Sequence, residues 1–343
     1  MKVAVYYSNS DVRIEDVPKP EIGEGELLVK VMASGICGSD TMEWYRVKKA
    51  PLVLGHEVAG VVEEVGEGAL DFQKGDRVIV THHVPCDDCS FCRSGVETMC
   101  ETLRTTKFYP GGFTEYLRVP KINVEKGTLQ LPPEVSFDAG TFVEPLACVV
   151  RGQRKIGLKA GQTVLVLGSG ISGLLHIQLA KAAGVEKVIA TDVSPFRLKA
   201  ARVLGADVVI DAKDDVPTRV LRENNGKPAD RVIVCTGAPS AIKQSLQSID
   251  RGGTILFFAP TEKGVEIPIH VDELWINEIT LATSYGAVKS DLEKALELIE
   301  RKEINVEDMI THRLSLSETE RGFKIFTNAE GVDSIKVIIN PNS

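Results

Sequence analysis

The chain contains 343 residues, of which 43% are hydrophobic and 26% are charged, a composition typical of a globular protein with about two domains. Acidic residues (48) outnumber Lys and Arg (40), and the resulting net charge of −8 disfavours binding to nucleic acid. There is no apolar run near the ~20 residues of a membrane span and no apolar core of a signal peptide near the N-terminus, so we expect a cytoplasmic protein without nucleic-acid or membrane partners.

The N-terminal part of the chain has the pattern of a β-rich domain. Three apolar runs of strand length lie at residues 26–32, 58–66 and 76–80, and the segments between them contain glycine and proline. Short strands separated by turn residues are typical of barrel-like units. We therefore expect a β-rich domain over residues 1–148.

Four cysteines within this domain have the spacing of a metal site. Cys86, Cys89, Cys92 and Cys100 form the run C-x2-C-x2-C-x7-C. Four thiolates can close a tetrahedral shell around one Zn²⁺, and a shell without an open position indicates a structural zinc. In a cytoplasmic protein this clustering favours metal binding over disulfides. We expect a structural zinc lobe over about residues 84–102.

A second set of zinc-type ligands precedes the cysteine lobe. Cys37 follows the first long apolar run, and His56 and Glu57 are adjacent in the chain. Catalytic zinc uses three protein ligands and leaves one position for water or substrate. On spacing alone, a histidine in a strand-rich core is more often a hydrogen-bonded structural residue than a metal ligand.

From about residue 160 the pattern changes to strands that alternate with helices of about ten residues. This alternation predicts a parallel, doubly wound α/β sheet over residues 149–286. The remaining segment, 287–343, contains an amphipathic helix at 291–301 and a strand at 334–339 that we expect to return to the first domain. The expected strands are 163–167, 188–191, 208–210, 230–234 and 254–258, and the expected helices are 171–183, 195–204, 215–224 and 239–249.

The first strand of this region leads into a dinucleotide-binding fingerprint. Gly168, Gly170 and Gly173 form G-x-G-x-x-G directly after a strand, with a helix expected to begin at Ile171. The three glycines allow a tight turn, close approach of a pyrophosphate and close packing of helix on strand. The N–H groups of the first helical turn, including Ile171 and Ser172, would bind the phosphates.

Asp192 lies 19 residues beyond Gly173, at the end of the second strand. A carboxylate at this position accepts hydrogen bonds from both ribose hydroxyls and repels a 2′-phosphate, so it favours NAD over NADP. Arg197 follows closely, and stacking on adenine and a solvated position on the helix are equally good interpretations.

These motifs together resemble the zinc-containing medium-chain dehydrogenase/reductase (alcohol dehydrogenase) family. The resemblance extends over essentially the whole chain, and it implies a GroES-like catalytic domain, a Rossmann domain and a homodimer or homotetramer paired through the strand near 254–258 or near 279–283. The segments that carry it are Gly35-Ile-Cys-Gly-Ser-Asp40, Gly55-His-Glu57, Lys74-Gly-Asp-Arg-Val78, the cysteine lobe, Gly111-Gly-Phe-Thr-Glu-Tyr116, Glu144-Pro-Leu-Ala147 and Gly168–Gly173.

The resemblance also assigns the catalytic zinc. It implies that Cys37, His56 and Glu57 are ligands and that Glu144 is either a fourth ligand or the residue that holds a zinc-bound water. Glu144-Pro-Leu is similar to the polyol branch of the family, which includes sorbitol, threonine and butanediol dehydrogenases. The resemblance therefore implies two zinc ions per chain, one catalytic and one structural, and NAD as the cofactors.

Further roles follow from the same resemblance. Asp40 would orient His56, the Ser39 hydroxyl would take the proton of the substrate alcohol, and Cys148 would lie against the nicotinamide ring. Many members of the family have a proton-relay histidine where this chain has Met42. A ribose hydroxyl with another acid, a chain of water molecules and the adjacent Glu43 are the alternatives, and we hypothesise Glu43 because it is adjacent and ionisable.

The expected function is therefore NAD-dependent oxidation of a secondary alcohol (a polyol, sugar derivative, diol or amino alcohol) to a ketone. The alternative is a zinc enzyme that acts mainly as a carbonyl reductase or on simple alcohols. A zinc-free reductase of the same superfamily would lack both ligand sets. A zinc-ribbon module that binds nucleic acid is disfavoured by the acidic composition.

Overall fold

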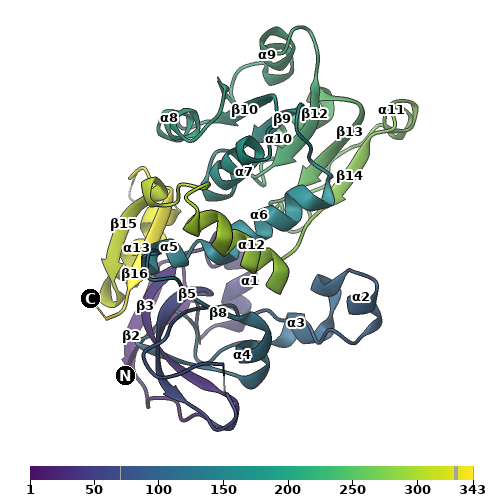
Figure 1. The fold of residues 1–343 in the computed structure, drawn as a ribbon. Helices are drawn as coiled ribbons and strands as arrows, with labels where there is room; N and C mark the ends of the chain where they lie inside the picture. Colours follow the sequence, from purple (N-terminus) through teal and green to yellow (C-terminus); the bar gives the residue numbers. More distant parts are fainter. Residues whose placement is uncertain (70, 328–330, 343) are drawn as a thin grey trace. The chain divides into compact units, whose positions relative to one another are not determined.

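The computed structural model describes residues 1–69, 71–327 and 331–342 of the chain, which divides into two compact units. The first unit comprises Met1–Ala147, Gly286–Lys302 and Val306–Ser343, and the second comprises Cys148–Tyr285 and Glu303–Asn305. The first is rich in β structure and the second contains a parallel sheet flanked by helices (Figure 1). The α/β fold class with a GroES-like and a Rossmann-type part is confirmed.

The first unit is built around a seven-stranded sheet in the order β15-β16-β3-β5-β6-β8, with β7 also paired to β3. The C-terminal strand β16 lies antiparallel to β3, so the last segment of the chain completes the sheet that the first segment begins (Figure 1). A smaller sheet has the order β2-β1-β4. The strands are β1 (Lys2–Ser8), β2 (Asp11–Asp16), β3 (Leu27–Gly35), β4 (Leu52–Val53), β5 (Glu57–Val65), β6 (Arg77–Val80), β7 (Tyr116–Val119), β8 (Thr128–Gln130), β15 (Ile310–Ser315) and β16 (Lys336–Asn340).

Short helices interrupt the strands of this unit, and the strand-length patterns before residue 148 did not predict them. Most are one turn long, so they contain too few residues for a helical periodicity to be visible in the sequence. They are α1 (Glu43–Arg46), α2 (Ser90–Arg93), α3 (Glu101–Thr105), α4 (Lys121–Gly127), α5 (Phe137–Gly140) and the start of α6 (Val143–Lys155). The C-terminal segments add α12 (Lys289–Glu300) and α13 (Thr319–Phe326).

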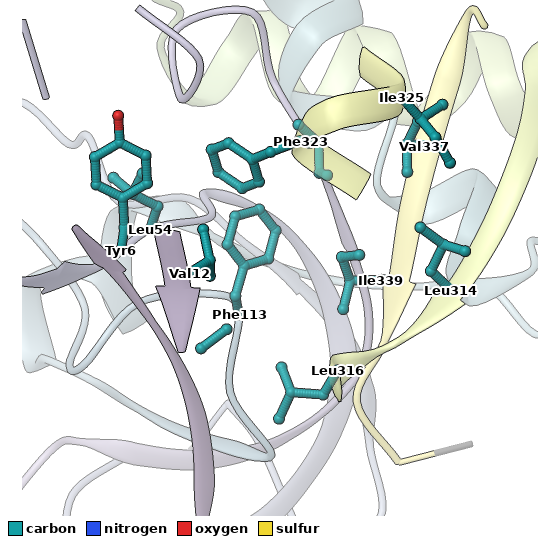
Figure 2. Packing of buried hydrophobic residues seen from close by; sticks show 12 residues of the cluster. Tyr6, Val12, Leu54, Phe113, Leu314, Leu316, Phe323, Ile325, Val337 and Ile339 are labelled. Atoms are coloured by element: carbon teal, nitrogen blue, oxygen red, sulfur yellow. The ribbon is translucent and has the colours of Figure 1, made fainter. Parts of the chain in front are cut away.

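The two ends of the chain share one hydrophobic core in this unit (Figure 2). Tyr6 on β1 and Phe323 on α13 have ring centroids 5.6 Å apart, and Phe113 meets the same Phe323 ring at 6.0 Å. Ile339 on β16 is fully buried in the same cluster. Residues more than 300 positions apart therefore bury each other's apolar surface, and the first unit depends on both ends of the chain.

The second unit contains a six-stranded, wholly parallel sheet in the order β11-β10-β9-β12-β13-β14. The chain moves outward from β9 and then returns to start again at β12, so the order reverses between these two strands, where such sheets bind nucleotides. The strands are β9 (Thr163–Leu167), β10 (Lys187–Asp192), β11 (Val208–Asp211), β12 (Ala229–Val234), β13 (Ile249–Phe257) and β14 (Thr280–Thr283).

The helices of the second unit begin and end within a few residues of the expected positions. They are α7 (Ile171–Ala182), α8 (Pro195–Val203), α9 (Val216–Glu223), α10 (Pro239–Ser248) and α11 (Val271–Ile276), the last of which was not expected. One of the two expected edge strands is wrong, because β13 is enclosed between β12 and β14 and only β14 lies at the end of the sheet. Across the described ranges, none of the helices has the length and apolar character needed to span a bilayer.

Candidate active site and nucleotide-binding turn

The first unit brings three candidate zinc ligands together. Cys37 follows β3, and His56 and Glu57 lie at the start of β5. Because β3 and β5 are antiparallel and Gly35 is paired with Glu57, the turn after β3 must pass beside the first residues of β5. One ligand atom from each of Cys37, His56 and Glu57 lies within 4.8 Å of the others. Glu144 is not part of this three-residue group; it lies in the first turn of α6, and its role at the zinc stays a prediction.

The surroundings of His56 fit a metal ligand. Its Nδ1 lies 3.3 Å from Oδ1 of the fully buried Asp40, so Nε2 is left to face a metal. Oδ2 of Asp40 accepts a hydrogen bond from the N–H of Cys37 at 3.1 Å. Burial alone would raise the pKa of Asp40, but the charge of His56 and its contact with Asp40 lower it. Burial would lower the pKa of His56, and Asp40 and Cys37 raise it.

Glu57 has a partner that the sequence analysis missed. Lys336 on β16 forms an ion pair with Glu57 Oε2, and both side chains are almost completely buried. The ammonium group of Lys336 also lies 5.2 Å from the centre of the Phe142 ring. A carboxylate has two oxygens, so this pairing leaves Glu57 in the candidate ligand set. The only signal in the sequence is a single lysine inside the apolar run 335–339.

Arg46 on α1 contacts the proposed proton-accepting residue. Its Nε donates to the backbone oxygen of Ser39 at 2.8 Å, and its Nη2 donates to Ser39 Oγ at 3.2 Å. Nη2 also lies 3.6 Å from Asp40 Oδ1. Glu43 Oε1 instead accepts the N–H of Asn9 at 3.0 Å, and its role as a relay stays a prediction. Nothing in the sequence pattern indicated Arg46.

Two further histidines, which the sequence pattern also did not indicate, continue from His56. The rings of His56 and His82 have centroids 4.9 Å apart, and those of His82 and His83 are 3.6 Å apart. Burial lowers the pKa of His82, and His83 and His56 lower it further. Burial also lowers the pKa of His83, to about 4. Both are therefore neutral imidazoles near pH 7, and His82 lies directly beside His56.

The four cysteines of the lobe also converge. Three of their Sγ–Sγ distances are 3.9 Å (Cys86–Cys92), 3.5 Å (Cys89–Cys92) and 3.5 Å (Cys86–Cys100). Zinc–sulfur bonds of about 2.3 Å in a tetrahedron separate the sulfurs by about 3.8 Å, so the spacing fits one ion. Burial would raise the pKa of Cys100, but backbone N–H groups of Cys86 and Leu103 lower it to about 6. These amides stabilise the thiolate that zinc requires.

In the second unit, the glycine motif forms the turn from β9 into α7. Gly168 has φ +93°, a conformation that favours glycine. A Cβ at Gly173 would overlap the carbonyl oxygen of Gly168, whereas a Cβ at Gly170 would meet open space. Gly170 caps α7 without a side-chain hydrogen bond, so the N–H groups of Ile171 and Ser172 are available at the helix N-terminus. The turn has the shape and polarity of a phosphate site.

Asp192 lies at the C-terminal end of β10 and is 7% exposed. Its Oδ2 accepts the N–H of Ser169 at 2.8 Å, and its Oδ1 accepts the N–H of Ser194 at 2.9 Å. The carboxylate is thus fixed to the glycine turn and retains lone pairs for a ribose. Arg197 lies in the first turns of α8 and Cys148 on α6, and their contacts with adenine and nicotinamide stay predictions.

Two family models match the chain. Residues 23–132 match the alcohol dehydrogenase GroES-like domain, and residues 172–301 match the zinc-binding dehydrogenase domain. Among curated relatives, sorbitol dehydrogenase of Bacillus subtilis is 30% identical over 354 residues, covering 100% of this chain and 98% of the relative.

Solved structures give the same result. The 2R,3R-butanediol dehydrogenase of Bacillus subtilis is 30% identical, with a TM-score of 0.85 and 99% of each chain covered. A protein from Sinorhizobium meliloti 1021 described as a zinc-binding dehydrogenase, solved with NADP, is also 30% identical, with a TM-score of 0.89 over 99% of each chain.

Proposed function

The chain is a member of the zinc-binding alcohol dehydrogenase family, and from this premise we propose that it oxidises a secondary alcohol with neighbouring polar groups to a ketone, with NAD as hydride acceptor. The substrate class is a polyol, sugar derivative, diol or amino alcohol. The observation that carries the proposal is the convergence of Cys37, His56 and Glu57 in the first unit, with the backbone N–H of Ser39 3.5 Å from Cys37 Sγ.

The roles of the protein groups follow from this arrangement. Cys37, His56 and Glu57 would hold a zinc ion, which would supply a Lewis acid for the substrate oxygen. Asp40 fixes the orientation of the His56 ring. Ser39 accepts the hydroxyl proton of the substrate as the alcohol becomes a ketone. NAD, when bound, would supply the acceptor for the hydride of the alcohol carbon.

Asp192 supports NAD over NADP. Both carboxylate oxygens are fixed by backbone amides, so the negative charge cannot turn away from a 2′-phosphate. The relative from Sinorhizobium meliloti binds NADP, so membership of the family does not by itself determine the cofactor. The argument for NAD therefore depends on this residue, with Gly168, Gly170 and Gly173 serving either cofactor.

Two further proposals concern the whole protein. The first is a homodimer formed through β14, the edge strand of the second unit. Just before β14 in the chain, α11 exposes Val271 (71%), Trp275 (80%) and Ile276 (72%), an apolar surface unusual for an isolated subunit. The second is a cytoplasmic location, where the clustered thiols of the lobe remain reduced and able to bind zinc.

The test is NAD⁺ reduction, followed at the absorbance of NADH, with polyols, sugar acids, inositols, 2,3-butanediol, L-threonine and simple alcohols. We expect turnover of a substrate with a polar group next to the reacting carbon, lost in His56→Ala. We also expect NAD⁺ to exceed NADP⁺ in kcat/KM, with the preference reduced in Asp192→Ala. The alternative function would be supported if a simple alcohol were the best substrate, or if reduction of carbonyl compounds were faster than oxidation of alcohols. Equal use of NADP⁺ would contradict the role of Asp192.

A further inference from the structure

We infer that Arg46 is a positioning residue for proton transfer, holding the Ser39 hydroxyl and the Asp40–His56 contact in one fixed arrangement. The inference rests on the proposed function, because Ser39 is the proton acceptor only in an alcohol dehydrogenase. Arg46 belongs to the one-turn helix α1, and its side chain is only 17% exposed. Its guanidinium contacts the backbone of Ser39, the hydroxyl of Ser39 and the carboxylate of Asp40.

The first contact determines what the hydroxyl can do. A serine hydroxyl has one hydrogen to donate and two lone pairs that accept. Nη2 of Arg46 occupies one lone pair of Ser39 Oγ at 3.2 Å. One lone pair remains for the O–H of a substrate, and the hydrogen of Ser39 itself is directed to the next acceptor. When the substrate proton bonds to Oγ, the original Ser39 proton passes to a water molecule, so the residue ends the step as a hydroxyl.

The second contact connects the hydroxyl to the metal ligands. Asp40 is fully buried, and within the described ranges its Oδ1 makes no hydrogen bond, but it faces His56 Nδ1 at 3.3 Å and Arg46 Nη2 at 3.6 Å. A buried carboxylate oxygen needs such positive partners to remain ionised. Arg46 therefore stabilises the carboxylate that orients His56, while it also holds the serine two residues after Cys37.

Arginine is suited to this role for a geometric reason. Nε bonds the Ser39 carbonyl oxygen at 2.8 Å and Nη2 bonds its hydroxyl, so two donors of one planar group hold the same residue. A lysine has one ammonium group on a flexible chain and cannot make both bonds in a fixed geometry. The guanidinium also stays charged at every pH at which the enzyme could work.

The experiment compares Arg46→Ala, Arg46→Lys, Ser39→Ala and the double variant Arg46→Ala/Ser39→Ala in the holoenzyme. Loss of the fixed geometry should lower kcat by about 10- to 100-fold in Arg46→Ala, with little change in KM for the alcohol. Arg46→Lys should recover only a small part of this loss, and free guanidinium ion added to Arg46→Ala should recover more. Lys48→Ala removes the same charge from an exposed side chain nearby and should keep wild-type kcat.

The double variant identifies the route of the effect. Because Arg46 acts through both Ser39 and Asp40, the double variant should be slower than Ser39→Ala alone but faster than the product of the two single effects predicts. Fully multiplied effects would overturn the inference, because Arg46 would then act independently of Ser39. An equal loss of kcat in Lys48→Ala would also overturn it, because the cause would then be net charge.

A second readout does not depend on turnover. With Asp40 and the segment after Cys37 less restrained, the Arg46→Ala protein should lose one of its two zinc ions to a chelator severalfold faster than wild type, while Lys48→Ala should not. An unchanged rate would overturn the inference even if no alcohol substrate were found. Faster zinc loss without any alcohol turnover would instead locate the failure in the proposed function.

Discussion

The ion pair between Glu57 and Lys336 makes a sharp prediction about single residues. Both groups are buried, so removing one leaves a charge without a partner. We expect Lys336→Met to lower the free energy of unfolding of the metal-free protein by about 3–5 kcal/mol, measured by urea denaturation. Adding Glu57→Gln should recover part of the loss.

Lys30→Met on the neighbouring β3 is the control and should change stability little, because Lys30 is partly exposed. A double variant as unstable as Lys336→Met alone would show that the methionine itself, not the unpaired carboxylate, causes the loss.

A buried histidine in the second unit gives a prediction about pH. His176 on α7 is fully buried, its Nε2 has no hydrogen bond within the described ranges, and burial lowers its pKa to about 3. The unfolded chain takes up a proton near pH 6.5 and the folded chain does not, so stability is complete above 6.5 and falls as the pH decreases toward 3. This group alone should remove about 2 kcal/mol between pH 7 and pH 5.

The measurement is the urea midpoint as a function of pH for wild type and His176→Leu. The variant should lose less stability between pH 7 and pH 5 than wild type, by about the amount above. His270→Leu, at an exposed position before α11, is the control and should follow the wild-type slope. Parallel slopes for wild type and His176→Leu would show that His176 is already protonated or exposed in the folded protein.

Residues whose partners are close in sequence could be predicted from the pattern. The glycine turn and the cysteine lobe each lie within a segment of fifteen residues or fewer, and the chemistry of each is visible in its spacing. Lys336 and Glu57 lie 279 residues apart and meet only because β16 joins the sheet beside β3. Arg46 was missed for a different reason. The direction of its side chain depends on α1, a single helical turn that is too short to produce a periodicity in the sequence.

At the scale of elements, the cysteine lobe is expected to need its zinc. It contains the one-turn helix α2 and little apolar core beyond Cys100, Leu103 and Val288, so the metal must supply much of its stability. We expect Cys92→Ser to reduce the zinc content from two ions to one per chain and to lower the melting temperature. Cys235→Ala, which alters a cysteine outside both ligand groups, should keep both ions. Metal analysis gives the answer directly, and two ions in Cys92→Ser would contradict the four-cysteine assignment.

The order of strands was less predictable than their positions. Apolar runs bounded by turn residues located the strands of the second unit, because length and composition are local properties, although β13 begins at Ile249 and not at the expected Thr254. Whether β13 or β14 lies at the edge depends on where the chain after β13 turns back, and both runs are similarly apolar. The structure decides in favour of β14, whose Thr280 and Thr283 are exposed.

At the scale of the whole molecule, the remaining prediction concerns the dimer. A strand at the end of a sheet has backbone groups that can pair with another strand, and two copies of β14 related by a two-fold axis would pair antiparallel. The exposed Trp275 on α11 would then be buried between the copies. Trp275→Asp places a charge in that apolar surface and should convert the wild-type dimer into a monomer at micromolar concentration, as measured by sedimentation velocity. The circular dichroism spectrum should not change, because the side chain has few contacts within its own subunit.

Val203→Asp is the matched control. Val203 is 69% exposed, but it lies on α8, which packs against β11 at the opposite edge of the same sheet. A monomeric wild type would rule out the dimer, and a dimer that persists in Trp275→Asp would place its interface on another surface.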